Sequence, residues 1–134
     1  MRYAIDAATL LALARDRRPV ANHQLVGPNS LRTRALELAL GEVRDGALAE
    51  QDARSLQDRI TEIPLRLLGD RVSRGLAWRL ARDADWPDLR DAEILAVARL
   101  QADALVTTDP ALIAKAAGVV TVADYEALFV ADLA

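Results

Sequence analysis

Short β-like apolar runs alternate along this chain with longer stretches that have the period of an α-helix. This alternation predicts an α/β fold with a parallel sheet, because parallel strands are joined by helices that pack on the faces of the sheet. With 134 residues, the chain is long enough to bury a core of its own, and we expect one domain over residues 1–134. The predicted strands are residues 3–5, 24–27, 64–68, 104–107 and 119–122.

Capping and turn residues divide the rest of the chain into helices. Asn29 or Ser30 can cap a helix after the second strand, and Gly46 suits its end. Pro110 suits the first turn of a later helix. The predicted helices cover about residues 8–15, 29–45, 49–60, 70–84 (beginning at Asp70 or Ser73), 88–102 (capped by Asp88), 110–117 and 124–129.

Three aspartates occupy positions that favour a site at the end of the sheet. Asp6 directly follows the first predicted strand, Asp109 follows the run 104–108, and Asp91 opens a long amphipathic stretch. Carboxylates at the carboxyl ends of buried parallel strands face the crevice of an open sheet. Close carboxylates repel one another unless a hard cation or a proton separates them, and Mg²⁺ or Mn²⁺ prefers oxygen ligands. Each aspartate alone has a simpler interpretation as a helix N-cap, and Asp109 with Pro110 is a good capping pair.

Composition excludes several other kinds of site. The chain has no cysteine and His23 is its only histidine, so thiol catalysis, zinc thiolate sites and Ser-His chemistry are not expected. His23 is better placed for a surface or turn role. The first residues reach an acid too early for a secretory signal, and no apolar run approaches the length of a membrane span. We therefore expect a cytoplasmic protein without a membrane partner.

The net charge of −3 does not indicate a polyanion partner, although 16 of the 17 basic residues are arginine and Lys115 is the one lysine. This arginine content favours local phosphate contacts, or reflects only the codon usage of a GC-rich genome. Trp78 belongs to an apolar pattern that predicts a core position, with stacking on a base as the alternative. Its helix also carries a basic cluster, which is either a solvated face or an RNA-backbone track: Arg71, Arg74, Arg79 and Arg82.

The ordered motifs of the chain resemble those of PIN domains, and more narrowly those of VapC-type toxins. The motifs span nearly the whole chain in the family's order and spacing, and we identify them as residues 4–7 (AIDA), 25–28 (LVGP), 90–98 (RDAEILAVA) and 104–109 (ALVTTD). The resemblance implies a three-layer α/β/α fold with a central, mainly parallel sheet of about four to five strands. It also implies a ribonuclease that depends on Mg²⁺ or Mn²⁺, dimerises, and is neutralised by a small VapB-like antitoxin.

The same resemblance assigns roles to individual residues. Asp6, Asp91 and Asp109 match the acidic metal ligands of the family, and Thr107 or Thr108 matches the hydroxyl beside the last aspartate. Hydrolysis of a phosphodiester needs an activated water, an in-line approach and stabilisation of developing negative charge, which metal ions held by carboxylates supply. We therefore expect Asp6, Asp91, Asp109 and Thr107 to be catalytic.

The chain departs from the family at one acidic position. PIN nucleases of this type usually carry a glutamate early in their second helix, and this chain has Arg34 there. The guanidinium of Arg34 could lie among the three aspartates and replace the ion, which would make the chain a catalytically impaired binding module. Glu37, on nearly the same helix face, is the alternative fourth metal ligand, or it forms an intrahelical salt bridge with Arg34. Glu93 points elsewhere and is expected to be peripheral.

Overall fold

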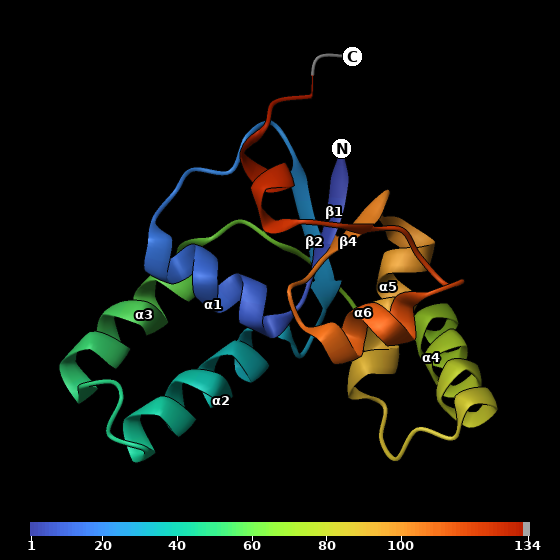
Figure 1. Ribbon diagram of the computed structural model, residues 1–134, viewed down its shortest axis with the longest axis horizontal. Coiled ribbons are helices and arrows are strands. Elements are labelled where there is room, and N and C mark those ends of the chain that lie inside the picture. The colour runs from blue at the N-terminus through green and yellow to red at the C-terminus, as the bar shows by residue number, and fades with distance from the viewer. Residues whose placement is uncertain (133–134) are drawn as a thin grey trace.

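The computed structural model describes residues 1–132, and over these residues five parallel strands form one sheet. The strands are β1 (Arg2–Ile5), β2 (Gln24–Pro28), β3 (Arg66–Leu68), β4 (Ala104–Val106) and β5 (Val122–Ala123). Their order across the sheet is β3-β2-β1-β4-β5, and every neighbouring pair is parallel. The first strand therefore lies in the middle of the sheet (Figure 1), and the predicted parallel α/β arrangement is confirmed.

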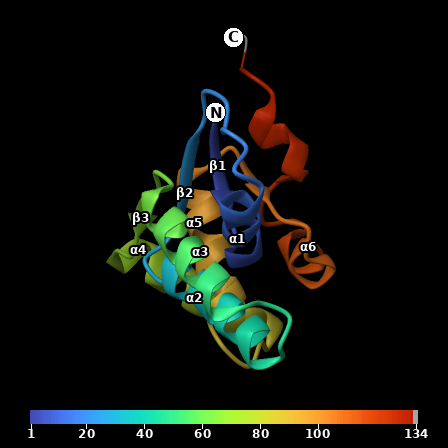
Figure 2. The same ribbon diagram turned by 90° about the vertical axis from the view of Figure 1, so that its left-hand side faces the viewer.

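Helices connect the strands and cover both faces of the sheet (Figures 1 and 2). None of those within residues 1–132 is long and apolar enough to cross a membrane. They are α1 (Ala7–Asp16), α2 (Leu31–Arg44), α3 (Glu50–Glu62), α4 (Arg71–Ala84), α5 (Arg90–Gln101), α6 (Pro110–Ala116) and the 3₁₀ helix η1 (Tyr125–Phe129).

Alternate residues of the central strand supply the two halves of the core. Tyr3 and Ile5 pack in one cluster with residues of α1, α2 and α3, whereas Ala4 packs in a second cluster with residues of α5 and α6. This alternation follows from the two-residue period of a strand, which points successive side chains to opposite faces. The fold is therefore an α/β/α sandwich, and the helices that directly follow strands begin at the carboxyl edge, the end of the sheet where the parallel strands finish.

Helix α5 is buried around most of its circumference, so the amphipathic stretch expected from the sequence is wrong. Ala92 and the run 94–98 are all buried. The reason is that α5 lies between the sheet and α4, packing on strand residues such as Leu105 on one side and on Ala77 and Ala81 on the other. A helix covered on two sides needs apolar residues around most of its surface.

Trp78 is 59% exposed, so its predicted core position is also wrong. Helix α4 approaches α5 through small side chains, with Ala77 and Ala81 packed against Ala92 and Ala96. This alanine contact brings the two helices close together and leaves the large indole on the outer face of α4. All four arginines of the basic cluster on the same helix are exposed as well.

Helix ends follow the predicted capping residues at several points. Asp70 accepts the backbone N–H of Ser73 at the start of α4, and Asp124 accepts that of Ala127 at η1. Asp88 is not the cap of α5, because the capping position is Leu89, although Asp88 accepts the backbone N–H of Arg90. The second helix ends as expected before Gly46, whose φ of +77° is a left-handed conformation that glycine adopts without strain.

The last strand differs from the sequence prediction. The backbone N–H groups of Val119 and Val120 both donate to the carbonyl of Ala116, so these residues close the turn after α6. Pairing with β4 begins only at Val122, which lies beside Leu105. The predicted strand 119–122 is therefore shifted toward the C-terminus.

Candidate functional site

The three predicted aspartates line one cavity of about 340 Å³ at the carboxyl edge of the sheet. Asp6 follows β1 and caps α1, and Asp109 lies beyond β4 and caps α6. Because β1 and β4 are parallel neighbours, with Ile5 beside Val106, these two carboxylates leave the sheet at adjacent points. Asp91 joins them from the first turn of α5. The lining also includes Arg34 and Glu37 of α2 and Arg90 of α5.

The carboxylate of Asp6 is held by three donors. Its Oδ1 accepts the backbone N–H of Thr9 at 3.0 Å and the Thr9 hydroxyl, and its Oδ2 accepts the Thr107 hydroxyl at 2.7 Å. Hydrogen bonds to a charged carboxylate are short and strong, and they fix its orientation. The sequence analysis did not single out Thr9. A threonine three residues after a capping aspartate is the signal that could have identified it.

Thr107 connects two of the acids through one hydroxyl. It is only 2% exposed, donates to Asp6, and accepts the backbone N–H of Asp109 at 3.1 Å. Thr108, the alternative in the sequence, is exposed. Asp109 itself uses Oδ1 to accept the N–H of Ala111 at 3.0 Å, so it is a helix cap as well as a cavity residue. The cap interpretation and the site interpretation are thus compatible at this position.

Asp91 forms an ion pair that the sequence analysis missed. The ammonium of Lys115, on α6, lies 2.7 Å from its Oδ2. The same ammonium lies 5.1 Å from the centre of the Trp86 ring, within the range of a cation–π contact. The position of Lys115 on the helix after Asp109, in a chain whose other basic residues are arginine, is the signal that could have drawn attention to it.

Arg34 does not form an ion pair with any of the three aspartates, so its predicted pairing with that cluster is wrong. Its guanidinium instead lies 3.2 Å from Glu93, which also accepts the Ser30 hydroxyl at 2.9 Å. The first turns of α2 and α5 bring these residues together, and Glu93 lines a neighbouring cavity. The intrahelical bridge between Arg34 and Glu37 is likewise wrong: Glu37 is exposed, and over residues 1–132 it has no ion pair.

The donor set of the cavity fits a hard divalent ion held by few protein ligands. Within residues 1–132, no group of three acids or histidines is arranged so that it could hold a metal ion, and Asp91 is paired with Lys115. Mg²⁺ nevertheless keeps several waters and commonly binds through one or two carboxylates. Asp6 and Asp109 meet that need, because a carboxylate has about four acceptor sites and each of these still has some free.

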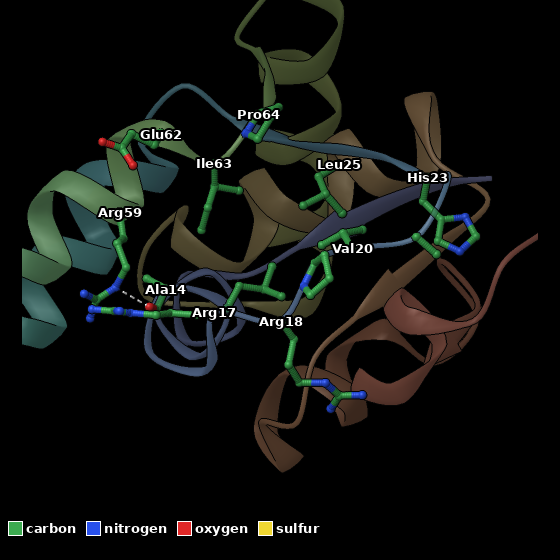
Figure 3. Close-up of a pocket in the computed structure, with 13 residues that line it drawn as sticks. Ala14, Arg17, Arg18, Val20, His23, Leu25, Arg59, Glu62, Ile63 and Pro64 are labelled. Atoms are coloured by element: carbon green, nitrogen blue, oxygen red, sulfur yellow. Dashed lines mark hydrogen bonds between the residues drawn. The ribbon is translucent and has the colours of Figure 1, made fainter.

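A second cavity, of about 490 Å³, lies at the opposite end of the sheet (Figure 3). The residues around it lie at the ends of α1 and α3, in the segments before β2 and β3, and at the start of β2, which places the cavity at the amino edge. Its walls are mainly apolar, as at Leu25 and Ile63, and Glu62 is the only acid among its lining residues. Its volume is larger, but it lacks the clustered carboxylates that hydrolysis with a metal requires. The chemistry of the lining therefore selects the smaller cavity as the candidate site.

Comparisons with known proteins agree with this architecture. No protein-family model matches the chain, and no curated protein matches its sequence. The crystal structure of PAE2754 from Pyrobaculum aerophilum is similar, with a TM-score of 0.69 and 25% identity over 96% of each chain. The structure of VapBC-1 from nontypeable Haemophilus influenzae has a TM-score of 0.62 and 16% identity, over 93% of this chain and 98% of that one. Together with the parallel sheet, these likenesses show a PIN-like three-layer α/β/α fold.

Proposed function

We propose that the chain is a metal-dependent endoribonuclease of VapC type, which hydrolyses RNA phosphodiester bonds with Mg²⁺ or Mn²⁺. The observation that carries this proposal is the meeting of Asp6, Asp91 and Asp109 in one cavity at the carboxyl edge of a PIN-like sheet. The likeness to the VapBC-1 structure supports the same class. Arg34 pairs with Glu93 and not with the three aspartates, which favours the ribonuclease over the alternative, a binding module in which Arg34 neutralises the acidic cluster.

Each side chain of the cavity has a role that its contacts support. A bound divalent ion would supply charge stabilisation at the phosphoryl oxygens and an activated water. Asp6 and Asp109 would hold that ion. Thr107 fixes the positions of both aspartates, because its hydroxyl donates to the carboxylate of Asp6 and accepts the backbone N–H of Asp109. Arg34 and Arg90 line the same cavity and present positive charge to an entering phosphate. Catalysis of this kind depends on positioning and electrostatics, which a buried hydroxyl and fixed carboxylates provide.

The outer face of α4 extends the proposal to RNA binding. Trp78 is exposed there together with Arg71, Arg74 and Arg82, at spacings of three or four residues that place them on one side of a helix. An exposed indole can stack on an unpaired base, and flanking guanidinium groups can bind phosphates. This arrangement supports single-stranded RNA as the substrate.

The proposed partners are a small VapB-like antitoxin and a second copy of the chain, in the cytoplasm. Apolar side chains on the surface of α2 support a protein partner, because soluble domains rarely expose many large apolar groups close together. Leu36 and Leu40, one turn apart on the same face of α2, are 36% and 49% exposed, and Leu38, on another side of the helix, is 44% exposed. Leu38 lines the candidate site itself, so a protein that covers this side of α2 would also cover the cavity.

The first test is cleavage of a labelled single-stranded RNA by the purified chain. We expect cleavage with Mg²⁺ or Mn²⁺, none in EDTA, and recovery when excess Mn²⁺ is added back. A DNA of the same sequence is the matched control and should stay intact under the same conditions. Cleavage that persists in EDTA, or that proceeds equally on DNA, would contradict the proposal.

A further inference from the structure

We infer that Lys115 is a built-in cation of the candidate site, which keeps Asp91 from binding metal and contacts a phosphate of the RNA. The site then takes one divalent ion, on Asp6 and Asp109, and Lys115 supplies a second fixed positive charge. This inference rests on the proposed ribonuclease function and assigns Lys115 a substrate-binding role within it.

The ion pair of Lys115 with Asp91 is constrained by the packing of α6 in the core and by the neighbouring ring of Trp86. Leu112 and Ala116 flank Lys115 on α6 and are buried in the core that α6 shares with α5, so the backbone of Lys115 is fixed relative to Asp91. The N–O distance is 2.7 Å, and Trp86 lies against the ammonium at 5.1 Å. A lysine constrained by packing and by two neighbours loses less freedom on binding a ligand than a free surface lysine does.

The ammonium can bind a phosphate without leaving Asp91. It has three N–H donors, and over residues 1–132 its one hydrogen bond is to Asp91, so two donors remain. The Lys115 side chain is 30% exposed, and the carboxylate of Asp91 that it contacts belongs to a residue lining the cavity. A phosphate oxygen there would lie close to Asp91 but would be attracted to the intervening cation.

The charges around the cavity favour one divalent ion over two. Four carboxylates line the cavity, from Asp6, Glu37, Asp91 and Asp109, together with the cations of Arg34 and Arg90. The ion pairs of these residues add Lys115 beside Asp91 and Glu93 beside Arg34, so the balance is two negative charges. One divalent ion would neutralise this balance, whereas two ions would leave two positive charges held close together.

Lys115 can be observed directly, because it is the chain's only lysine. Protein grown with lysine labelled with ¹³C at Cε should give one lysine Cε signal by NMR, and Asp91→Asn supplies the reference position for the unpaired ammonium. We expect saturating Mg²⁺ to leave the wild-type signal away from that reference. A single-stranded RNA added in EDTA should shift the signal. Movement to the Asp91→Asn position with Mg²⁺ alone, or no response to RNA, would overturn the inference.

Substitutions test the same inference by binding. Lys115→Met should release Asp91, so calorimetry should show a second Mn²⁺ or tighter binding than in wild type. It should also weaken RNA binding in EDTA about tenfold, the effect of losing one charged hydrogen bond, whereas Lys115→Arg should keep most of the affinity. Arg18→Met is the matched control, because it removes a cation 2.8 Å from the carboxylate of Glu126, far from the cavity.

The outcomes separate this inference from the proposed function. If wild type cleaves RNA with metal while Lys115→Met matches it in Mn²⁺ and RNA titrations, Lys115 only joins α6 to α5 and the inference is wrong. If wild type neither binds Mn²⁺ nor cleaves RNA, the proposed function fails and the inference fails with it. Circular dichroism of each variant checks that the fold is retained.

Discussion

Asp6→Asn is expected to lower the rate of RNA cleavage at least about 100-fold while the protein stays folded. The substitution removes the negative charge that would hold the metal ion, and a factor of 100 corresponds to only part of the several kcal/mol that a metal supplies. The amide retains an oxygen for the Thr9 donors, and its NH₂ group can donate to the Thr107 hydroxyl in place of accepting from it. The substitution should therefore slow cleavage without unfolding the protein.

Single-turnover cleavage with saturating enzyme measures the Asp6→Asn effect, and thermal unfolding without metal checks stability. Asp58→Asn is the matched control, since Asp58 is exposed on α3 and lies outside the cavity lining. It should cleave at the wild-type rate. An Asp6→Asn protein that cleaves within a factor of a few of wild type would show that the chemistry occurs elsewhere.

Thr107→Val should both destabilise the protein and slow cleavage. The change keeps the shape but removes a buried hydroxyl that donates to Asp6 and accepts from Asp109. The backbone N–H of Asp109 loses its acceptor, and we expect a loss of about 1–3 kcal/mol in the free energy of unfolding. Partners that orient a metal ligand typically contribute about 10- to 100-fold to metal affinity or activity, so a fall of that size in cleavage is expected.

Urea denaturation and single-turnover cleavage measure the two effects of Thr107→Val. Thr107→Ser keeps the hydroxyl and serves as the control, and it should recover most of the activity. If Thr107→Val is destabilised but cleaves normally, Thr107 supports the fold without orienting the aspartates. Equal activity of the valine and serine variants would lead to the same conclusion.

Local signals were sufficient to predict most of the elements. The apolar runs predicted the central strands. The two aspartates that follow such runs, Asp6 and Asp109, each cap a helix and also line the cavity. Asp6 and Asp109 could be found because chain direction places the ends of parallel strands at the same edge. Asp91 lies in a helix and has no strand to mark it; its place at the start of an apolar stretch pointed to it, and the family resemblance then matched it to an acidic position.

Contacts between distant segments could not be predicted in the same way. Lys115 and Asp91 are 24 residues apart, and Arg34 and Glu93 are 59 apart, so both ion pairs depend on how helices dock. The exposure of Trp78 depends on close contact between alanines of α4 and α5, which the periodicity of α4 alone does not specify. Side-chain partners chosen by helix packing are thus the part of the site that required the structure.

Calorimetric titration of the wild-type and Asp6→Asn proteins with Mn²⁺ most directly tests the central claim, that this cavity holds a metal-dependent site. We expect saturable binding of one ion to wild type, with a rise in thermal midpoint, because a ligand present at 100 times its Kd stabilises the folded state by about 2.7 kcal/mol. Asp6→Asn and Asp109→Asn should each weaken the binding, and Asp58→Asn should not. No saturable binding by wild type at millimolar Mn²⁺, or equal binding by wild type and Asp6→Asn, would contradict a metal-dependent site in this cavity.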